Sequence, residues 1–493
     1  MTAPLGSELN LETTARHSVR HAGLLMAQQA LHVLAAGLFA VLVPRLMGPT
    51  MFGRYALLTS VAMWFALLSG LGAVSLITRT VPQFLAAGDT AALRKLFTNL
   101  LALRGATGLF TATAYAAVVT VALGVSDWVS VLLIAGAVCC RTVANVCFAL
   151  FLGLNQAARW GAGDLLRRWL TLVLVITGLL LAGLRGACAG FFTANLAVLL
   201  IGLMQAWTFL RWTDLDLGRR YLAPFLRIGT AFAAGNLLLA LAQRSGETIV
   251  RITTGDFAEV GYYGAAYSIY LTIAHALWQL AIAFAPFLVA RLHADQAPVV
   301  VSWLERLLKW MVIVAAPIAA GTLSLGGALV PLLLGPAYQP VAVNLIPLTL
   351  ALITLSVNSV GRLAALALDR PGLSAAAAAL ELAAFWALGL VLAPHWGSLG
   401  VCVAALAGSA VYSLSITWRL HRELAYSLRV PLQAGLLAST FLPLIWVRST
   451  LAIDVGLFVG AAALYVWLLW RFRIVGIGEI AEVRRLAGIA RRG

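Results

Sequence analysis

Long apolar stretches dominate this chain and constrain its fold more than any other feature. A helix needs about 20 mostly apolar residues to cross a bilayer, and fourteen stretches approach that length. Because a backbone in hydrocarbon must satisfy its polar groups internally, these stretches predict helices. The predicted spans are residues 22–44, 53–78, 98–123, 127–151, 169–184, 187–210, 225–251, 262–290, 306–334, 341–368, 373–393, 397–418, 431–448 and 452–471. The predicted fold is an all-α polytopic membrane protein.

Composition supports hydrocarbon as the main solvent of the chain. Hydrophobic residues make up 62% of it and charged residues 11%, whereas soluble domains are about one quarter charged. The net charge of +16 could indicate nucleic-acid binding. The basic residues, however, form short runs between apolar stretches. We therefore predict membrane lipids as partners, and no nucleic acid.

The basic residues also predict the orientation in the membrane. If the N-terminus is cytoplasmic, 25 of the 34 Lys and Arg residues lie in cytoplasmic segments, five in external loops and four inside spans. Such an excess on one side follows the positive-inside rule. Both ends are therefore predicted to be cytoplasmic, with residues 1–21 as an N-terminal segment and residues 472–493 as a basic tail.

An internal repeat predicts two lobes. The turn after the first span contains Gly48 and Gly53-Arg54-Tyr55, and the turn after the seventh contains Gly255 and Gly261-Tyr262-Tyr263. An offset of six spans keeps both copies in one orientation, which predicts a pseudo-two-fold axis along the membrane normal; a chance similarity is the alternative. The predicted parts are a six-helix lobe (22–211), a cytoplasmic loop (212–224), a second six-helix lobe (225–418) and two additional helices (419–471).

Three short elements resemble a known family. They are Leu42–Pro49 followed by Phe52–Tyr55, then Val260–Tyr263 with Pro286 further on, and Leu334–Tyr338. In this order they are similar to the polysaccharide transport family of the multidrug/oligosaccharidyl-lipid/polysaccharide flippase superfamily. The elements consist of Gly, Pro and aromatic residues, so they indicate the family better than its substrate.

The resemblance implies an O-antigen-type flippase in the bacterial inner membrane. Such a protein moves an undecaprenyl-diphosphate-linked oligosaccharide from the inner to the outer leaflet. The family fold has two six-helix lobes, often with two extra helices, which agrees with fourteen predicted spans. Polysaccharide assembly proteins are the partners that this resemblance implies.

Four arginines inside predicted spans are candidates for binding the diphosphate. They are Arg141, Arg244, Arg104 and Arg362. A charge in mid-membrane costs ~2.5–3.5 kcal/mol or more, and a guanidinium pairs well with phosphate, so we expect them to face a cationic cavity between the lobes. An ion pair with Glu247 is the alternative for Arg244. Snorkelling to the cytoplasmic surface is the alternative for Arg104 and Arg362.

Four other ionisable residues are candidates for ion or proton coupling. They are Glu381, Glu247, His275 and His32, all inside predicted spans. A buried carboxylate or a histidine can exchange a proton near neutral pH, although a lone buried histidine is also consistent with simple packing. The chain has no P-loop, so the expected energy source is an H⁺ or Na⁺ gradient, without a cofactor.

Other functions are less compatible with the sequence. The five cysteines lack zinc-site spacing, and Asp214-Leu215-Asp216 is a weak glycosyltransferase-like motif in a short loop. A membrane-embedded polymerase or glycosyltransferase would need a large external loop, so no enzyme is predicted. A lipid II flippase and a cation-coupled multidrug exporter of the same superfamily are the alternatives, although an exporter of organic cations should have a more acidic cavity.

Overall fold

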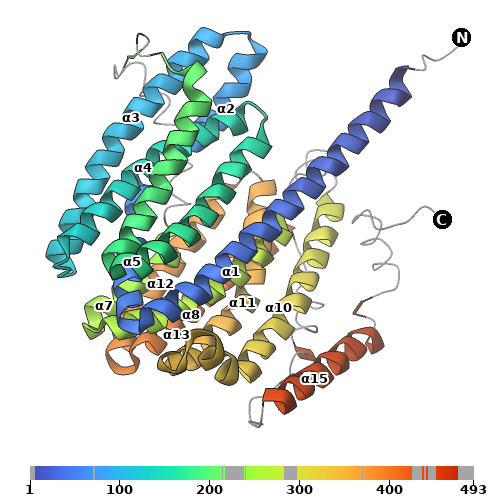
Figure 1. Ribbon diagram of the computed structural model, residues 1–493. Helices are drawn as coiled ribbons and strands as arrows, with labels where there is room; N and C mark the ends of the chain where they lie inside the picture. Colours follow the sequence, from blue (N-terminus) through green and yellow to red (C-terminus); the bar gives the residue numbers. More distant parts are fainter. Residues whose placement is uncertain are drawn as a thin grey trace, which may run out of the picture. The chain divides into compact units, whose positions relative to one another are not determined.

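The computed structural model is helical throughout the part of the chain that it describes (Figure 1). The described residues are 6–69, 73–211, 213, 215–216, 238, 240–282, 297–368, 370–424, 433, 436–437, 440–441, 451–472 and 474–475. Most of the predicted span 431–448, about half of residues 225–251 and Pro286 lie outside these residues.

Nine helices among the described residues are long and apolar enough to cross a membrane. Two of them are interrupted: Ala30–Leu68 breaks at Gly48, and Ala158–Phe209 breaks at Ala182 and Gly183. Large apolar side chains are exposed along the helices, for example Val121 at 85%. An exposed apolar surface of this kind suits lipid and not water. The prediction of an all-α multi-pass membrane protein is therefore confirmed.

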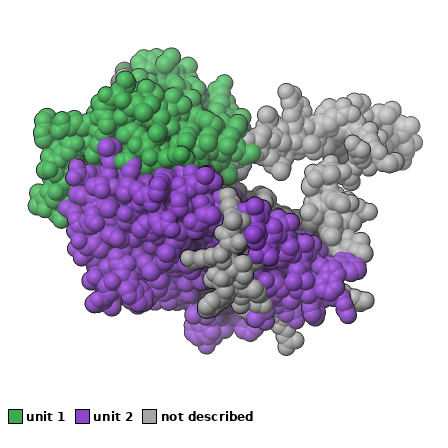
Figure 2. Space-filling model, turned by 60° about the horizontal axis from the view of Figure 1, so that its bottom comes forward, with its two compact units in different colours: residues 1–47, 57–237 green, residues 48–56, 238–493 purple. Residues whose placement is uncertain are grey.

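The chain divides into two compact units (Figure 2). Unit 1 comprises residues 1–47 and 57–237, and unit 2 comprises residues 48–56 and 238–493. Residues 48–56, which belong to unit 2 although the residues on both sides of them belong to unit 1, contain the first copy of the repeated turn.

Unit 1 is built around α4 (Trp128–Gly153). The other helices are α1 (Gly6–Leu68), α2 (Ala73–Ala86), α3 (Thr90–Ala117, extended by a π-helical turn at Val118–Ala122) and α5 (Ala157–Ala206). In Figure 1, α3, α4 and α5 run side by side. Along the C-terminal half of α4, nearly all side chains from Ala144 to Phe151 are buried against α2, α3 and α5.

The structure corrects two helix boundaries in unit 1. The predicted span 53–78 corresponds to parts of two helices, α1 up to Leu68 and α2 from Ala73, and the Ser69 carbonyl accepts a hydrogen bond from the Arg104 side chain. The predicted span 169–184 begins earlier, at Ala157. Polar residues in that first part lowered its hydropathy, but their charges pair along the helix.

Unit 2 contains seven described α-helices. They are α7 (Gly246–Thr254), α8 (Phe257–Ile282), α10 (Ala297–Leu334), α11 (Gln339–Ala367), α12 (Pro371–Trp396), α13 (Ser398–Leu424) and α15 (Leu451–Arg471). The α13 helix packs against both α11 and α12, and α10 packs against α11 and α15. The loop before α13 is fixed by Glu259 of α8, whose Oε2 accepts a hydrogen bond from the Ser398 N–H at 2.7 Å.

The two repeated turns cross each other inside unit 2. Gly48 and Gly255 each adopt a positive φ, of 71° and 69°, before the next helix begins. Beyond them, a Cβ on Gly53 would overlap the carbonyl oxygen of Phe257, and a Cβ on Gly261 would overlap that of Pro49. The contact is reciprocal. Gly53 faces the carbonyl of Phe257, four residues before Gly261, and Gly261 faces the carbonyl of Pro49, four residues before Gly53. Only glycine permits this backbone approach.

A basic residue expected near the cytoplasmic surface lies in the interior of unit 2. The α10 helix begins at Ala297 and not near residue 306, so Lys309 lies three turns inside it. Its side chain is buried, and Nζ donates a hydrogen bond to the Ile474 carbonyl at 3.0 Å. Lys309 therefore joins α10 to the end of α15.

An ion pair connects two turns of unit 1 that we predicted to be external. Asp127 precedes α4, and its Oδ1 accepts a hydrogen bond from Arg185 Nε at 3.0 Å. Partial burial raises the pKa of Asp127, but hydrogen bonds from Ser130 and Arg185 and the charge of Arg185 together leave this pKa below its usual value. The pair fixes the α3–α4 turn to the break within α5.

Candidate functional site

A cavity of about 220 Å³, with charged residues in a largely apolar lining, lies between α4 and α5 of unit 1. Arg141, the strongest sequence candidate, lines it together with Asn145 one turn later on the same helix. The full lining consists of Arg141, Ala144, Asn145, Phe148, Trp160, Gly163, Asp164, Arg167, Asn195 and Val198. The cavity thus combines aromatic walls with two guanidinium groups, two amides and one carboxylate.

Asp164 organises the charged side of this cavity. Its carboxylate pairs with Arg167, and Oδ2 lies 3.3 Å from Arg168 Nε. The same oxygen lies 3.4 Å from Nδ1 of His32 on α1. Arg167 also donates a hydrogen bond to Asn145 Oδ1 at 3.4 Å. One carboxylate therefore fixes two guanidinium groups and one imidazole.

The charges that line the cavity sum to a positive value. Arg141 and Arg167 contribute two positive charges, and Asp164 contributes one negative charge. In addition, Asn195 is buried, and its Oδ1 has no hydrogen-bond partner among the described residues. A positively charged cavity with aromatic walls can accommodate an anionic group attached to a polar, ring-containing ligand.

Asp164 and Arg167 line the cavity but are not among the residues that the sequence indicates. A predicted span that begins at residue 169 places both in a cytoplasmic loop. The spacing of Asp164, Arg167 and Arg168 at i, i+3 and i+4 was the available signal. Charged groups at this spacing lie on one helix face and pair there, so the pattern favours a helix over a loop.

The surroundings of Arg104 indicate a role in stabilising the end of a helix. It is 2% exposed, and its guanidinium donates a hydrogen bond to the Ser69 carbonyl at the end of α1. The Ser69 hydroxyl in turn lies 3.0 Å from that of Thr142 on α4. Arg104 thus completes the hydrogen bonding of a helix end. It does not line either of the two cavities described here.

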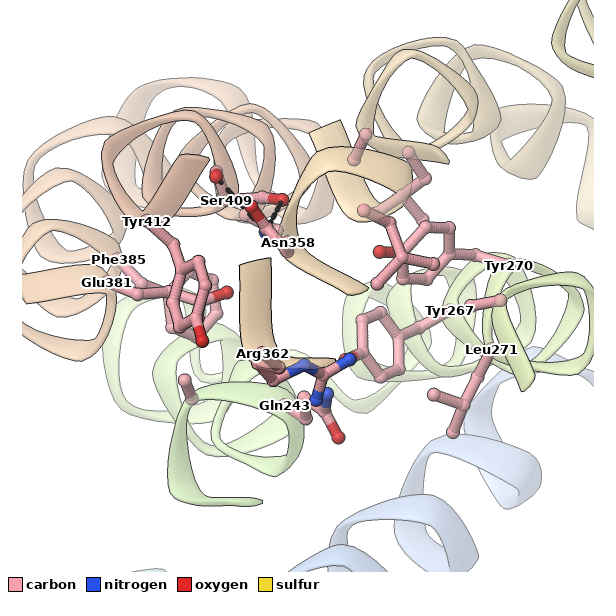
Figure 3. Close-up of a pocket in the computed structure, with 16 residues that line it drawn as sticks. Gln243, Tyr267, Tyr270, Leu271, Asn358, Arg362, Glu381, Phe385, Ser409 and Tyr412 are labelled. Atoms are coloured by element: carbon pink, nitrogen blue, oxygen red, sulfur yellow. Dashed lines mark hydrogen bonds between the residues drawn. The ribbon is translucent and has the colours of Figure 1, made fainter. Parts of the chain in front are cut away.

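A second, smaller cavity lies within unit 2 (Figure 3). It has a volume of about 50 Å³ and contains two of the sequence candidates, Arg362 of α11 and Glu381 of α12. Its other polar lining residues are Gln243, Tyr267, Tyr270, Asn358, Ser409 and Tyr412.

Arg362 and Glu381 share this cavity without forming an ion pair. The guanidinium carbon of Arg362 lies 4.1 Å from the centre of the Trp278 ring, a distance typical of a cation–π contact. Figure 3 shows the guanidinium directed toward Gln243 and Tyr267, whereas Glu381 lies beside Tyr412. Both Arg362 Nε and Glu381 Oε2 are buried without a hydrogen-bond partner in the described part of unit 2.

The remaining candidates lie outside these two cavities. Arg244 precedes α7, and Glu247 is buried in the first turn of that helix, where it feels the charge of Arg244. Glu247 Oε2 is buried without a hydrogen-bond partner among the described residues, so the ion pair with Arg244 stays a prediction. His275 is exposed on α8. It stays a prediction that one cavity between the lobes is shared by the four arginines, Arg141, Arg244, Arg104 and Arg362.

Neither a metal site nor a sugar-nucleotide site is indicated by the described residues. They contain no group of three or more His, Cys, Asp or Glu side chains suited to a metal. Asp216 of the D-x-D motif pairs with Lys95 at 3.0 Å, and its N–H donates to Asn99 Oδ1; Asp214 lies outside the described residues. Asp216 therefore anchors a loop to α3.

Comparison with known proteins extends these observations. The sequence profile of the family described as "Polysaccharide biosynthesis protein" matches residues 42–343. No curated protein sequence matches the chain significantly.

Several solved structures share the fold. The lipid II flippase MurJ in an inward closed conformation is 13% identical, with a TM-score of 0.69 over 93% of this chain and 100% of that chain. A MATE-family multidrug resistance transporter of the MOP superfamily, in an inward-facing conformation, is 16% identical, with a TM-score of 0.62 over 80% of this chain and 94% of that one. An outward-facing MATE structure gives a TM-score of 0.53 at 16% identity, over 81% of this chain and 92% of that one. These similarities show a MurJ- and MATE-like fold.

Proposed function

We propose, because the chain belongs to the polysaccharide biosynthesis protein family, that it is a flippase for undecaprenyl-diphosphate-linked oligosaccharides. The family and the fold are those of transporters and not of enzymes. In this proposal the protein moves a repeat unit of the O-antigen or exopolysaccharide type across the bacterial inner membrane by ion-coupled alternating access. Both termini are cytoplasmic, and the partners are membrane lipids, the lipid-linked saccharide and polysaccharide assembly proteins.

The observation that carries the proposal is the cavity shared by Arg141 and Arg167 in unit 1. A diphosphate needs charge-assisted donors, which two guanidinium groups supply. Asp164 keeps Arg167 in place but leaves the lining net positive. The aromatic rings of Phe148 and Trp160 offer apolar faces on which a sugar ring can stack.

The architecture that we propose has fourteen spans in two pseudo-symmetric six-helix lobes, followed by two additional helices. The reciprocal contact of Gly53 and Gly261 supports the symmetry, because equivalent positions of the repeat make equivalent contacts. Coupling to H⁺ or Na⁺ is proposed for Glu381 or Glu247, each of which has a buried oxygen without a hydrogen-bond partner among the described residues.

A cation-coupled multidrug exporter is less consistent with this cavity. Its organic cations would be repelled by Arg141 and Arg167, and Asp164 is already paired with three basic side chains. A lipid II flippase would use the same diphosphate chemistry. The family description favours a polysaccharide intermediate.

The proposal is tested by complementation of a deletion strain. Loss of the protein should leave lipid-linked repeat units on the inner leaflet and remove surface polysaccharide. Arg141→Ala and Arg167→Ala should each lower export about 10- to 100-fold at normal membrane levels, since a hydrogen bond to a charged group contributes about 1.5–3 kcal/mol. Surface polysaccharide and inner-leaflet intermediate are quantified in parallel.

Arg79→Ala is the matched control. Arg79 is exposed on α2, away from both cavities, so export should remain at the wild-type level. Unchanged export in Arg141→Ala would remove this residue from the mechanism. Rescue of a strain that lacks its lipid II flippase, with no effect on polysaccharide, would identify the alternative substrate.

A further inference from the structure

The cavity of unit 2 is too small for a saccharide or a diphosphate. Its volume is about 50 Å³, and one water molecule requires roughly 10–15 Å³ measured in the same way. A ligand of this cavity therefore has the size of an ion or of a few water molecules. The role of Arg362 and Glu381 is therefore better explained by their influence on each other than by binding of the transported lipid.

Three of the six other polar residues that line the cavity are hydrogen-bonded to side chains. Asn358 donates a hydrogen bond to Ser409 Oγ at 3.0 Å and accepts one from Ser413 Oγ at 2.5 Å. The Tyr412 hydroxyl lies 2.8 Å from that of Ser374. Glu381 Oε2 and Arg362 Nε are the lining atoms that remain buried and unpaired in the described region.

These two groups are held apart by their surroundings. The stacking of Arg362 on Trp278 and its orientation toward Gln243 keep it from closing an ion pair with Glu381. Burial without hydrogen bonds favours the neutral acid form of Glu381, whereas the nearby positive charge favours the carboxylate. Because the two influences oppose each other, a small change in either can alter the protonation state.

The other ionisable groups around Glu381 do not replace Arg362 as its counter-charge. Three tyrosines face it: Tyr267 and Tyr270 from α8, and Tyr412 from α13. The two charged residues nearby are Glu247 in α7 and Arg244 just before that helix. The tyrosines are neutral near pH 7, and Arg244 is not among the residues that line the cavity. Arg362 is the cation that lines the cavity with Glu381.

We propose that this cavity is a proton-binding site at Glu381, and that Arg362 is a built-in cation that excludes Na⁺. A sodium ion would need several oxygen ligands in a space that already faces a guanidinium group, and the two cations repel. A proton forms an O–H bond on the carboxylate and neutralises it without any further ligand. The inference deepens the proposed function, on which it rests, by assigning H⁺ as the coupling ion.

Infrared difference spectroscopy of the purified protein in lipid vesicles tests the inference directly. Lowering the pH should produce the carbonyl band of a protonated carboxylic acid, which should be missing in Glu381→Gln and retained in Glu247→Gln. Replacement of Na⁺ by choline at constant ionic strength should leave the band unchanged. A band that Na⁺ abolishes at constant pH, or one that survives in Glu381→Gln, would overturn the proposal.

Variants of Arg362 test its role as the fixed cation. In Arg362→Gln the midpoint of the band's titration should move upward by about one to three pH units, and Na⁺ should then compete with the proton. Arg362→Lys keeps the charge, so Na⁺ should remain without effect. Competition by Na⁺ in Arg362→Lys, or an unshifted midpoint in Arg362→Gln, would contradict the exclusion role. Because no transport is measured, these outcomes are independent of the phosphate site at Arg141.

Discussion

The charged groups inside the described helices differ in their surroundings. Arg104 donates a hydrogen bond to the carbonyl of Ser69, and Lys309 donates one to that of Ile474. Arg362 stacks on an indole ring. Arg141 lines a cavity that retains a net positive charge. Burial of a cation is therefore not by itself a sign of ligand binding here; the open, positively charged space around Arg141 distinguishes it.

Asp164 is the residue whose removal should disturb unit 1 most. It is 27% exposed and pairs with Arg167, Arg168 and His32. Breaking a fully buried pair costs about 3–5 kcal/mol. Because Asp164 is partly exposed, we expect Asp164→Asn to lower the free energy of unfolding by roughly 1–3 kcal/mol, measured by thermal unfolding in detergent micelles.

Asp89→Asn serves as the control for this substitution. Asp89 accepts a hydrogen bond from the Ala92 N–H at 2.8 Å as the N-cap of α3. Asparagine caps a helix about as well as aspartate, so this variant should unfold at nearly the wild-type temperature. Equal unfolding temperatures for Asp164→Asn and the wild type would refute the organising role of Asp164.

At the scale of elements, interruptions of helices determine how unit 2 is assembled. The positive φ values of Gly48 and Gly255 allow the chain to turn before α8 and before the second half of α1. The two helices then cross at Gly53 and Gly261 with backbone in contact with backbone. The repeat identified in the sequence is therefore also a packing interface.

The crossing predicts an unusual sensitivity to a single methyl group. Gly53→Ala and Gly261→Ala should each destabilise the protein by about 1–3 kcal/mol or more, because the added Cβ overlaps a carbonyl oxygen. Gly37→Ala, also on α1, has open space at Cβ and should be neutral or stabilising by up to about 1 kcal/mol. Thermal unfolding of the three variants compares them; a Gly53→Ala protein as stable as Gly37→Ala would exclude the close crossing.

The two glycines should also be energetically coupled. Once one methyl group has separated the helices, the second meets less resistance. The double variant should therefore lose less stability than the sum of the single variants. Simple additivity would indicate that the two contacts are independent.

At the scale of the whole molecule, the distribution of basic residues predicts the orientation in the membrane. Arg185 belongs to a predicted external turn and Arg370 to a predicted cytoplasmic one, and both side chains are exposed. In a background without the five native cysteines, Arg185→Cys should react with an impermeant maleimide in intact cells. Arg370→Cys should react only after the membrane is permeabilised. The reverse labelling pattern would invert the topology.

Hydropathy and glycine positions along the chain predict the class of the protein, the approximate position of many helices and the two similar turns, because lipid solvation imposes long apolar segments and glycine marks tight turns. An isolated charge also stands out in an apolar segment, which makes Arg141 a candidate, and the structure places it in the lining of a cavity. Only the tertiary structure decided which charges are already satisfied. Arg104 meets a carbonyl 35 residues away, and Asp164 and Arg167 enter the cavity because their mutual pairing extends α5. Such pairings depend on three-dimensional proximity between helices, which hydropathy along the chain does not encode.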